Sequence, residues 1–235
     1  MLIFMWSGPR NLSTALMRSF ENRDDTIVHD EPFYSYYLSK TQLNHPMKNE
    51  IIKTYPTSQS DIIKKITKNP KNKIYYQKHM THHIIKNTKI EWIKKGYNCF
   101  LIRHPSKVIN SYIQKNTLHN INDIGFKKQF EIFKKLKKNN LKFTVINADD
   151  ILVNPIKTIK KLCKKLNINF SKKMLNWPKG NRNTDGIWSK IWYKKVLQSS
   201  TFNKYKNEQI NIPKKYSKIY DESLKYYNAM NKYSL

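Results

Sequence analysis

The chain has 235 residues, 39% of them apolar, which is enough for one domain with a sizeable core. No stretch approaches the roughly 20 apolar residues that span a bilayer, and the opening "MLIFM" is too short for a secretory signal, so we expect a cytoplasmic protein. The net charge of +29 comes from 40 lysines spread along the chain, without an HTH, zinc-finger or RRM signature, so sequence-specific nucleic-acid binding is not indicated.

Strands and helices alternate along the sequence. We expect strands at 2–6, 26–28, 73–76, 98–102 and 141–147. We expect helices at 12–22, 59–68, 82–95, near 106–117, at 126–138, from Pro155 onward and near 217–231. Beyond about residue 170 the pattern is loop-like until the last helix. This alternation with short links is typical of a single α/β domain over 1–235, with a central, mostly parallel sheet flanked by helices.

The two cysteines, Cys99 and Cys163, each lie within an apolar segment. That setting favours reduced core thiols over a disulfide or a metal site. No H-x-x-x-H or CxxC arrangement has convincing ligand spacing, so we expect no metal.

Arginine is rare in this lysine-rich chain, with five residues among 45 cations. A retained arginine suggests a need for its flat, forked guanidinium, as when phosphate or sulfate oxygens are bound. Arg10, Arg103 and Arg182 are three of the five arginines, and three of the five glycines lie beside them. Their segments are therefore candidate anion sites.

The first candidate segment is the turn after the opening strand. A turn that leads from a buried strand into a helix can hold an anion on the free N–H groups of the helix. The residues that would wrap the anion are Ser7, Gly8, Pro9, Arg10, Asn11, Leu12, Ser13 and Thr14. The alternative is an ordinary N-cap, with Asn11 or Ser13 starting the helix.

The second candidate segment is "FLIRHPSKVINSY", in which a strand ends at Arg103 and Ser111 follows eight residues later. If a helix starts near Ser106, the Ser111 hydroxyl lies on its second turn and could join the arginine on a second phosphate. Since ligands gather at the carboxyl ends of parallel strands, we expect both segments to share one site.

Together the two segments resemble the sulfotransferase family, whose donor is 3′-phosphoadenosine-5′-phosphosulfate. "GPRNLST" is similar to the family's loop for the 5′-phosphosulfate, and the Arg103–Ser111 pair is similar to its 3′-phosphate signature. The resemblance runs from residue 2 to about 170 and implies a P-loop-like sulfotransferase fold. Leu12 stands where the family has glycine, and a late R-K-G motif is only approximated, so further 3′-phosphate contacts are expected from Lys179, Gly180 and Arg182.

Catalysis by this family needs groups that stabilise a leaving phosphate oxygen and a base for the acceptor proton. Arg10 is placed for the first task. For the second, Asp30-Glu31-Pro32 resembles the Glu-Pro of some branches, with Glu31 as base. Lys78, His79, His82 and His83 resemble the Lys-x-His neighbourhood of others, with His79 or His82 as base. The alternative for the histidines is capping or packing.

Aromatic residues crowd the expected cleft. The candidate acceptor-binding residues are Trp6, Asp30, Tyr34, Tyr37, Trp188 and Trp192, and Tyr36 and Tyr193 lie in the same segments. These rings either fill a small core or, beside two carboxylates, attract a small cationic alcohol such as choline.

The expected partner is a small-molecule acceptor, with no specific nucleic acid and no membrane, and a homodimer is compatible with the sequence. A P-loop kinase and a non-enzymatic polyanion-binding protein are the competing functions; the absent Gly-Lys-Ser/Thr argues against the kinase.

Overall fold

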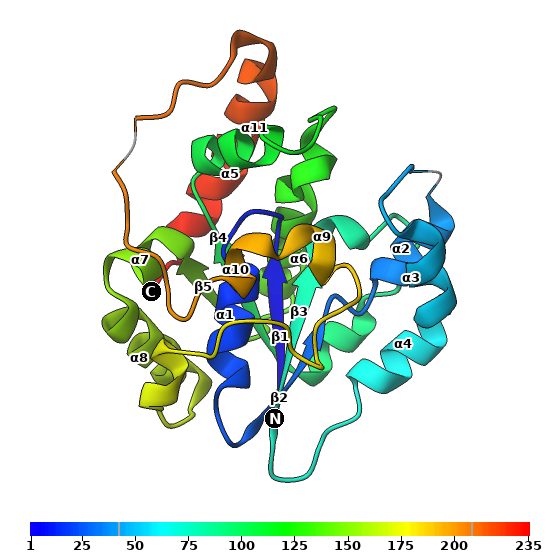
Figure 1. Ribbon diagram of the computed structural model, residues 1–235, viewed down its shortest axis with the longest axis vertical. Coiled ribbons are helices and arrows are strands. Elements are labelled where there is room, and N and C mark those ends of the chain that lie inside the picture. The colour runs from blue at the N-terminus through cyan, green and yellow to red at the C-terminus, as the bar shows by residue number, and fades with distance from the viewer. Residues whose placement is uncertain (42, 208) are drawn as a thin grey trace.

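Five parallel strands form one sheet in the computed structural model, which describes residues 1–41, 43–207 and 209–235. The strand order is β2-β3-β1-β4-β5 (Figure 1). The strands are β1 (Leu2–Ser7), β2 (Thr26–Asp30), β3 (Ile74–Met80), β4 (Tyr97–Ile102) and β5 (Phe143–Asn147). Every pair of neighbours is parallel, which confirms the predicted α/β class.

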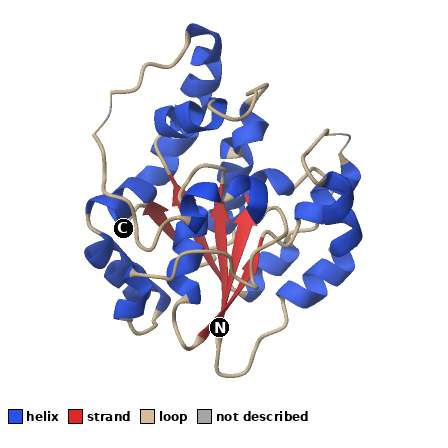
Figure 2. Ribbon diagram, viewed as in Figure 1, coloured by secondary structure: helices blue, strands red, loops and turns tan. Residues whose placement is uncertain are grey.

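The central strand β1 is buried along its whole length because helices cover both faces of the sheet (Figure 2). Successive side chains point to opposite faces. Phe4 and Trp6 therefore pack in one core with α6 (Phe126–Lys138) and α11 (Ser217–Asn231). Ile3 and Met5 pack in the other with α1 (Ser13–Glu21) and α8 (Pro155–Leu166).

Seven further helices and five short 3₁₀ segments complete the described chain. The helices are α2 (Tyr34–Lys40), α3 (Lys48–Thr54), α4 (Gln59–Ile66), α5 (Pro105–Ile113), α7 (Ala148–Val153), α9 (Ser189–Trp192) and α10 (Lys194–Leu197). The 3₁₀ segments are η1 (Thr81–His83), η2 (Glu91–Lys95), η3 (Ile121–Ile124), η4 (Lys172–Leu175) and η5 (Lys214–Tyr216). The sequence did not predict α2, α3, α7, α9 or α10, which are short.

The helix predicted over 82–95 is wrong. Only the 3₁₀ segments η1 and η2 form there, and the chain between them is irregular. Asn87, Thr88 and neighbouring β-branched residues disfavour a helix, because their side chains compete with or crowd its backbone. The apolar residues that suggested a helix are nevertheless buried: Ile84 and Trp92 pack in the same core as Phe4 and Trp6.

The lengths of two predicted elements also differ from the structure. Strand β3 continues to Met80, four residues beyond the predicted end, and so includes Lys78 and His79. Helix α5 ends at Ile113 rather than near residue 117, and Ser111 lies on its second turn as expected.

Both cysteines are buried and free, as predicted. Among the described residues, no helix is long and apolar enough to cross a bilayer. The same residues include no group of three or more His, Cys, Asp or Glu side chains placed to hold a metal ion.

Candidate active site

The turn after β1 adopts an unusual backbone that presents the start of α1. Arg10 and Leu12 are both left-handed, with φ of 65° and 69°. Leu12 is the N-cap of α1, and no described side chain caps that helix. Asn11 instead donates from Nδ2 to the carbonyl of Leu101 at 3.2 Å. The capping alternative is therefore wrong, and the first N–H groups of α1 can donate to an anion.

Close backbone packing fixes this turn and requires glycine. A Cβ on Gly8 would lie 2.4 Å from the carbonyl oxygen of Ile124 in η3. Gly125, at φ 73°, lies against Gly8, and a Cβ there would lie 2.5 Å from Thr81 Oγ1. The turn is thus held between η1 and η3, with no room for a side chain at either glycine.

Gln129 of α6 hydrogen-bonds the ends of β1 and β4, a contact that the sequence did not predict. Its buried amide donates to the carbonyls of Trp6 at 3.1 Å and Leu101 at 3.0 Å. These carbonyls lie at the carboxyl ends of β1 and β4, so Gln129 joins the two strands that carry the candidate segments. A glutamine on the apolar face of the predicted helix, between Phe126 and Phe133, was the available signal.

The structure brings the two predicted anion-binding segments together. Arg10 Nε donates to Ser111 Oγ at 2.9 Å, and Arg103 Nη1 donates to the carbonyl of Arg10 at 3.0 Å. Burial, together with the charge of Arg103, lowers the pKa of Arg10. Two guanidinium groups in one partly buried site repel each other, and a bound anion would relieve that repulsion.

Asp149, at the start of α7, positions the second segment. Its carboxylate lies 3.6 Å from Arg103 Nε and 3.0 Å from Lys107 Nζ. Arg103 Nε is buried and has no hydrogen-bond partner among the described residues. Arg103 is thereby oriented by the Asp149 carboxylate and by the carbonyl of Arg10.

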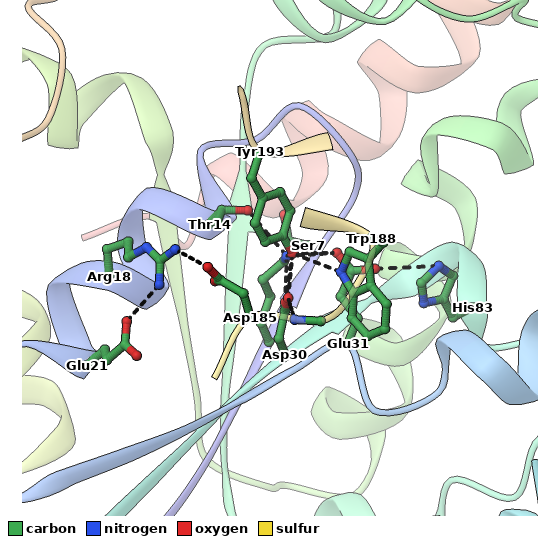
Figure 3. A network of polar contacts seen from close by, with 12 residues as sticks. Ser7, Thr14, Arg18, Glu21, Asp30, Glu31, His83, Asp185, Trp188 and Tyr193 are labelled. Atoms are coloured by element: carbon green, nitrogen blue, oxygen red, sulfur yellow. Dashed lines mark hydrogen bonds and ion pairs between the residues drawn. The ribbon is translucent and has the colours of Figure 1, made fainter. Parts of the chain in front are cut away.

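A buried ionic cluster lies next to the turn, where β2 and β3 end (Figure 3). Lys78 Nζ is 2.7 Å from Glu31 Oε1, 2.8 Å from Asp30 Oδ1 and 3.2 Å from Thr14 Oγ1. Thr14 belongs to α1, so Lys78 connects the candidate anion loop with the two carboxylates. The predicted residues Glu31, Asp30, Lys78 and Thr14 therefore share one site.

Burial and mutual contact perturb the ionisation of this cluster. Burial raises the pKa of Glu31 above its ordinary value, against the opposing effect of Lys78. Burial disfavours the charge on Lys78, but Asp30 and Glu31 outweigh it and raise the Lys78 pKa. A carboxylate with a raised pKa beside a retained ammonium group is typical of a general base and an electrostatic stabiliser.

Tyr193 reaches this cluster from the far end of the sequence. Its hydroxyl lies 2.7 Å from Asp30 Oδ2 and 3.2 Å from Glu31 Oε1, and it accepts hydrogen bonds from Lys78 Nζ and, at 3.2 Å, from Trp188 Nε1. Its pKa is raised well above the ordinary value, first by burial and then by the two carboxylates. The sequence grouped Tyr193 with other aromatic residues but assigned it no contact.

Two predicted site residues lie elsewhere, in the core on the opposite face of the sheet. His79 follows Lys78 in β3, so its side chain points the other way. Its ring lies 4.7 Å from that of Trp6 and is buried. Trp6 is fully buried and donates to Asn98 Oδ1 at 2.9 Å. We correct both assignments: His79 and Trp6 pack the core and do not face the cluster.

Of the other two histidines in the predicted set, His83 lies nearer to Glu31 than His82, the candidate base, does. His83 Nε2 is 3.9 Å from Glu31 Oε2, whereas the ring of His82 packs edge-on against Tyr37. Burial lowers the pKa of both, to about 3 for His82. Both rings are therefore neutral at physiological pH.

The predicted aromatic residues gather beside Glu31. Tyr34 stacks on His83 with ring centres 4.5 Å apart and lies edge-on to Trp188 at 4.9 Å. Tyr37 also stacks on His83, at 4.9 Å, and Trp192 donates to the Tyr34 hydroxyl at 3.3 Å. Four of the predicted acceptor-binding aromatics thus form one group.

The third predicted anion-binding segment is tied to α1 and α10. Gly180 N donates to the carbonyl of Leu197, and Arg182 N donates to Asp185 Oδ2 at 2.9 Å. Lys179 is exposed. None of the described hydrogen bonds or ion pairs joins Lys179, Gly180 or Arg182 to Arg103 or Ser111. Arg182 Nε and Nη2 are nevertheless buried without a partner among the described residues.

The buried ion pair between Arg18 and Asp185 anchors this late segment to α1. Arg18 is 1% exposed and lies 2.6 Å from Asp185 Oδ2 and 2.9 Å from Glu21 Oε2. We expect Asp185→Ala to lower the free energy of unfolding by about 3 kcal/mol, because it leaves a buried guanidinium underpaired. Urea denaturation measures this loss. The control, Lys173→Ala, breaks an exposed pair with Asp24 and should change stability by less than about 1 kcal/mol. Equal losses in the two variants would contradict the anchoring role.

The buried histidines should make the protein sensitive to mild acid. A histidine whose folded-state pKa is lowered takes up a proton only on unfolding, so stability falls as the pH drops from 6.5 toward the folded pKa of about 3 for His82. We expect His82→Asn to reduce the loss of stability between pH 6.5 and 4.5 by about 1 kcal/mol for each pH unit. Urea midpoints across this range test the expectation, and identical pH slopes for variant and wild type would refute it.

Fold and site together define a P-loop-like α/β protein whose turn after β1 and arginine after β4 converge. The family model for the sulfotransferase domain matches residues 1–234, so the chain belongs to the sulfotransferase domain family. Sulfuryl transfer is the general activity that this membership supports. The resemblance inferred from the loop and the Arg103–Ser111 pair is confirmed.

Solved structures share the fold. The sulfotransferase domain from the curacin biosynthetic pathway superposes with a TM-score of 0.63 at 19% identity, covering 94% of this chain and 96% of that one. The sulfotransferase domain from the Synechococcus PCC 7002 olefin synthase gives 0.62 at 15% identity, covering 100% of this chain and 95% of that one.

Two curated relatives are longer proteins. They are the branched-chain-amino-acid aminotransferase-like proteins 1 and 2 of Arabidopsis thaliana, 31% and 30% identical over 97% of this chain. The chain spans only 41% of the length of each. The activities that these names suggest for the longer proteins are therefore not assigned to this chain.

Proposed function

We propose that this protein transfers the sulfuryl group of 3′-phosphoadenosine-5′-phosphosulfate to a hydroxyl of a small-molecule acceptor. The observation that carries the proposal is the contact of Arg10 with Ser111 and of Arg103 with the Arg10 backbone. It places two arginines and a helix N-terminus at the carboxyl ends of neighbouring strands, where one ligand with two anionic groups could be held. The family match over residues 1–234 supports treating the chain as one domain.

The two ends of the donor would be held by different segments. The turn from Ser7 to Thr14, with the first N–H groups of α1, would hold the 5′-phosphosulfate. Arg103 and Ser111 would hold the 3′-phosphate, since a guanidinium fork and a hydroxyl suit phosphate oxygens. The partnerless buried nitrogens of Arg182 fit an anionic ligand, which would supply the acceptors that these donors need.

In the proposed reaction the acceptor oxygen forms a bond to sulfur while the bond from sulfur to the 5′-phosphate oxygen breaks. Glu31 would take the acceptor proton, because its carboxylate lies beside Lys78 and its raised pKa suits a general base. Lys78 and Arg10 would stabilise the charge that develops on the transferred group and the leaving oxygen. Holding both reactants in one site removes much of the entropic cost.

For the acceptor we propose a small cationic alcohol such as choline. The cluster contains two carboxylates, Asp30 and Glu31, against one ammonium group, Lys78, and Tyr34 and Trp188 stand next to it. Ring faces and an excess of carboxylate attract quaternary ammonium groups. Incubation with radiolabelled donor should give labelled product from choline and little from neutral sugars. Equal labelling of both, or none from choline, rejects the cationic acceptor but leaves donor use intact.

Two other functions predict different ligand behaviour. A P-loop kinase would bind ATP with a divalent metal, and the missing Gly-Lys-Ser/Thr argues against it. A polyanion-binding protein would bind any nucleic acid with a steep salt dependence, unaffected by a single change at Ser111. Titration with adenosine 3′,5′-bisphosphate, ATP and a DNA duplex separates the three functions.

A further inference from the structure

The proposed catalytic cluster is closed by the protein's own chain. Asp30 is 4% exposed, Glu31 9% and Lys78 1%. Tyr193, itself 5% exposed, packs on them, and its ring lies 4.6 Å from Lys78 Nζ. An acceptor hydroxyl can therefore reach the position between Glu31 Oε1 and Lys78 Nζ only if Tyr193 leaves it.

The Tyr193 hydroxyl stands where an acceptor hydroxyl would have to stand. It is within hydrogen-bond distance of both carboxylates and of Lys78, and Lys78 in turn contacts Thr14 at the start of α1 (Figure 3). A proton acceptor on one side and a cation that reaches the candidate donor loop on the other are the surroundings that a nucleophilic hydroxyl needs.

The segment that carries Tyr193 is held mainly by the side chains that it places beside the cluster. In Figure 1, α9 and α10 are drawn in front of the ends of β1 and β3, and Tyr193, which joins the two helices, contacts Lys78 of β3. All residues of these two helices are described; α9 buries only Ser189, and α10 buries none. Contact with the cluster comes from Trp188, Tyr193 and the N–H of Gly186, which lies 3.3 Å from Asp30 Oδ2. Trp188 and Tyr193 also belong to a buried hydrophobic cluster with Tyr34, so the segment can withdraw only by breaking these contacts.

We propose that Tyr193 occupies the acceptor position as an internal surrogate, and that the segment Gly186–Leu197 withdraws when the true acceptor binds. This inference rests on the proposed function, because it takes Glu31 and Lys78 as the reacting site. Tyr193 is then a specificity-determining residue: only an acceptor that replaces its hydroxyl on Asp30, Glu31 and Lys78 gains entry.

Removing the Tyr193 side chain and adding phenol in its place tests the proposal. Tyr193→Ala leaves a cavity the size of the lost side chain, and added phenol should bind there with its hydroxyl at the cluster. Phenol would form a bond from oxygen to the donor's sulfur, adenosine 3′,5′-bisphosphate would leave, and the phenolic proton would pass to Glu31. We expect phenyl sulfate from Tyr193→Ala at a rate at least about 10-fold above wild type, since binding orients the phenol. No gain over wild type overturns the proposal.

A second variant covers the case in which alanine prevents folding. Tyr193→Leu keeps the inner half of the side chain but leaves room for water at the hydroxyl position. Without any acceptor, this variant should release sulfate from the donor faster than wild type, by about 10-fold if water gains the same orientation. Unchanged or slower release would show that the Tyr193 hydroxyl supports the site rather than occupies it, and would overturn the proposal.

Two controls separate the possible failures. Tyr216→Leu alters another buried tyrosine, in η5, and should leave donor hydrolysis unchanged. Binding of adenosine 3′,5′-bisphosphate is measured for every variant. If wild type does not bind it, the proposed function fails. If all variants bind it but neither phenol nor water gains activity, only the role of Tyr193 fails.

Discussion

Arg103→Ala is expected to weaken binding of adenosine 3′,5′-bisphosphate by about 100-fold, because two hydrogen bonds from a charged donor are lost. The structure gives the reason for so large an effect. Arg103 is fixed by the Arg10 carbonyl and by Asp149, so its free donors are already oriented and little entropy is lost on binding. Calorimetric titration of variant and wild type measures the change.

Two matched variants show whether this loss is specific. Arg103→Lys keeps the charge but not the fork, and should recover only part of the affinity. Lys173→Ala removes an exposed cation paired with Asp24 and should leave the affinity unchanged. If both alanine variants weaken binding equally, general attraction to the +29 chain accounts for binding and the Arg103 site is wrong.

Glu31→Gln is expected to lower kcat by about 10²- to 10⁴-fold while leaving the affinity for adenosine 3′,5′-bisphosphate nearly unchanged, because it removes a base but no phosphate contact. Glutamine keeps the size of the side chain and an oxygen that can accept from Lys78. The rate of labelled product formation from the donor and the best acceptor of the panel measures the loss.

The pH profile provides an independent check on Glu31. A general base works only when deprotonated, and burial raises the Glu31 pKa above its ordinary value. Wild-type kcat should therefore fall as the pH drops through this raised pKa, which lies above that of an exposed glutamate. His83→Gln serves as a control: its ring lies 3.9 Å from Glu31, and the acid limb should remain. If the acid limb of the kcat profile is lost in His83→Gln and persists in Glu31→Gln, the histidine is the base.

The sequence predicted the parts of the site that local pattern determines. The turn at Arg10 and the strand end at Arg103 each follow an apolar strand, and parallel strands bring their carboxyl ends to one edge of a sheet. Strand alternation therefore predicted that both segments lie at one edge of the sheet, and the structure shows that β1 and β4 are neighbours. The structure adds the contact itself, between Arg10 Nε and Ser111 Oγ.

The acidic cluster was predicted only in part, because two of its features depend on tertiary structure. Tyr193 lies 163 residues beyond Asp30 in a stretch without helical or strand periodicity, so no sequence pattern connected them. Lys78 and His79 were grouped because the predicted strand ended at residue 76. Since β3 continues to Met80, strand alternation sends the two side chains to opposite faces of the sheet.

Residues that hold the site together were missed for a related reason. Arg18 and Gln129 each lie on an amphipathic helix, where a polar residue is usually solvated. Arg18 instead pairs with Asp185, and Gln129 bonds the backbone of two strands. Their partners become visible only when the chain is folded.

The central claim is that the turn at Arg10 and the pair Arg103–Ser111 hold opposite ends of one doubly phosphorylated adenosine. Titration of the wild-type protein with adenosine 3′,5′-bisphosphate, without metal and at physiological salt, tests it most directly. The claim predicts saturable binding of one nucleotide per chain, tighter than binding of adenosine 5′-monophosphate under the same conditions. Equal binding of the two nucleotides, or none of either, would contradict it.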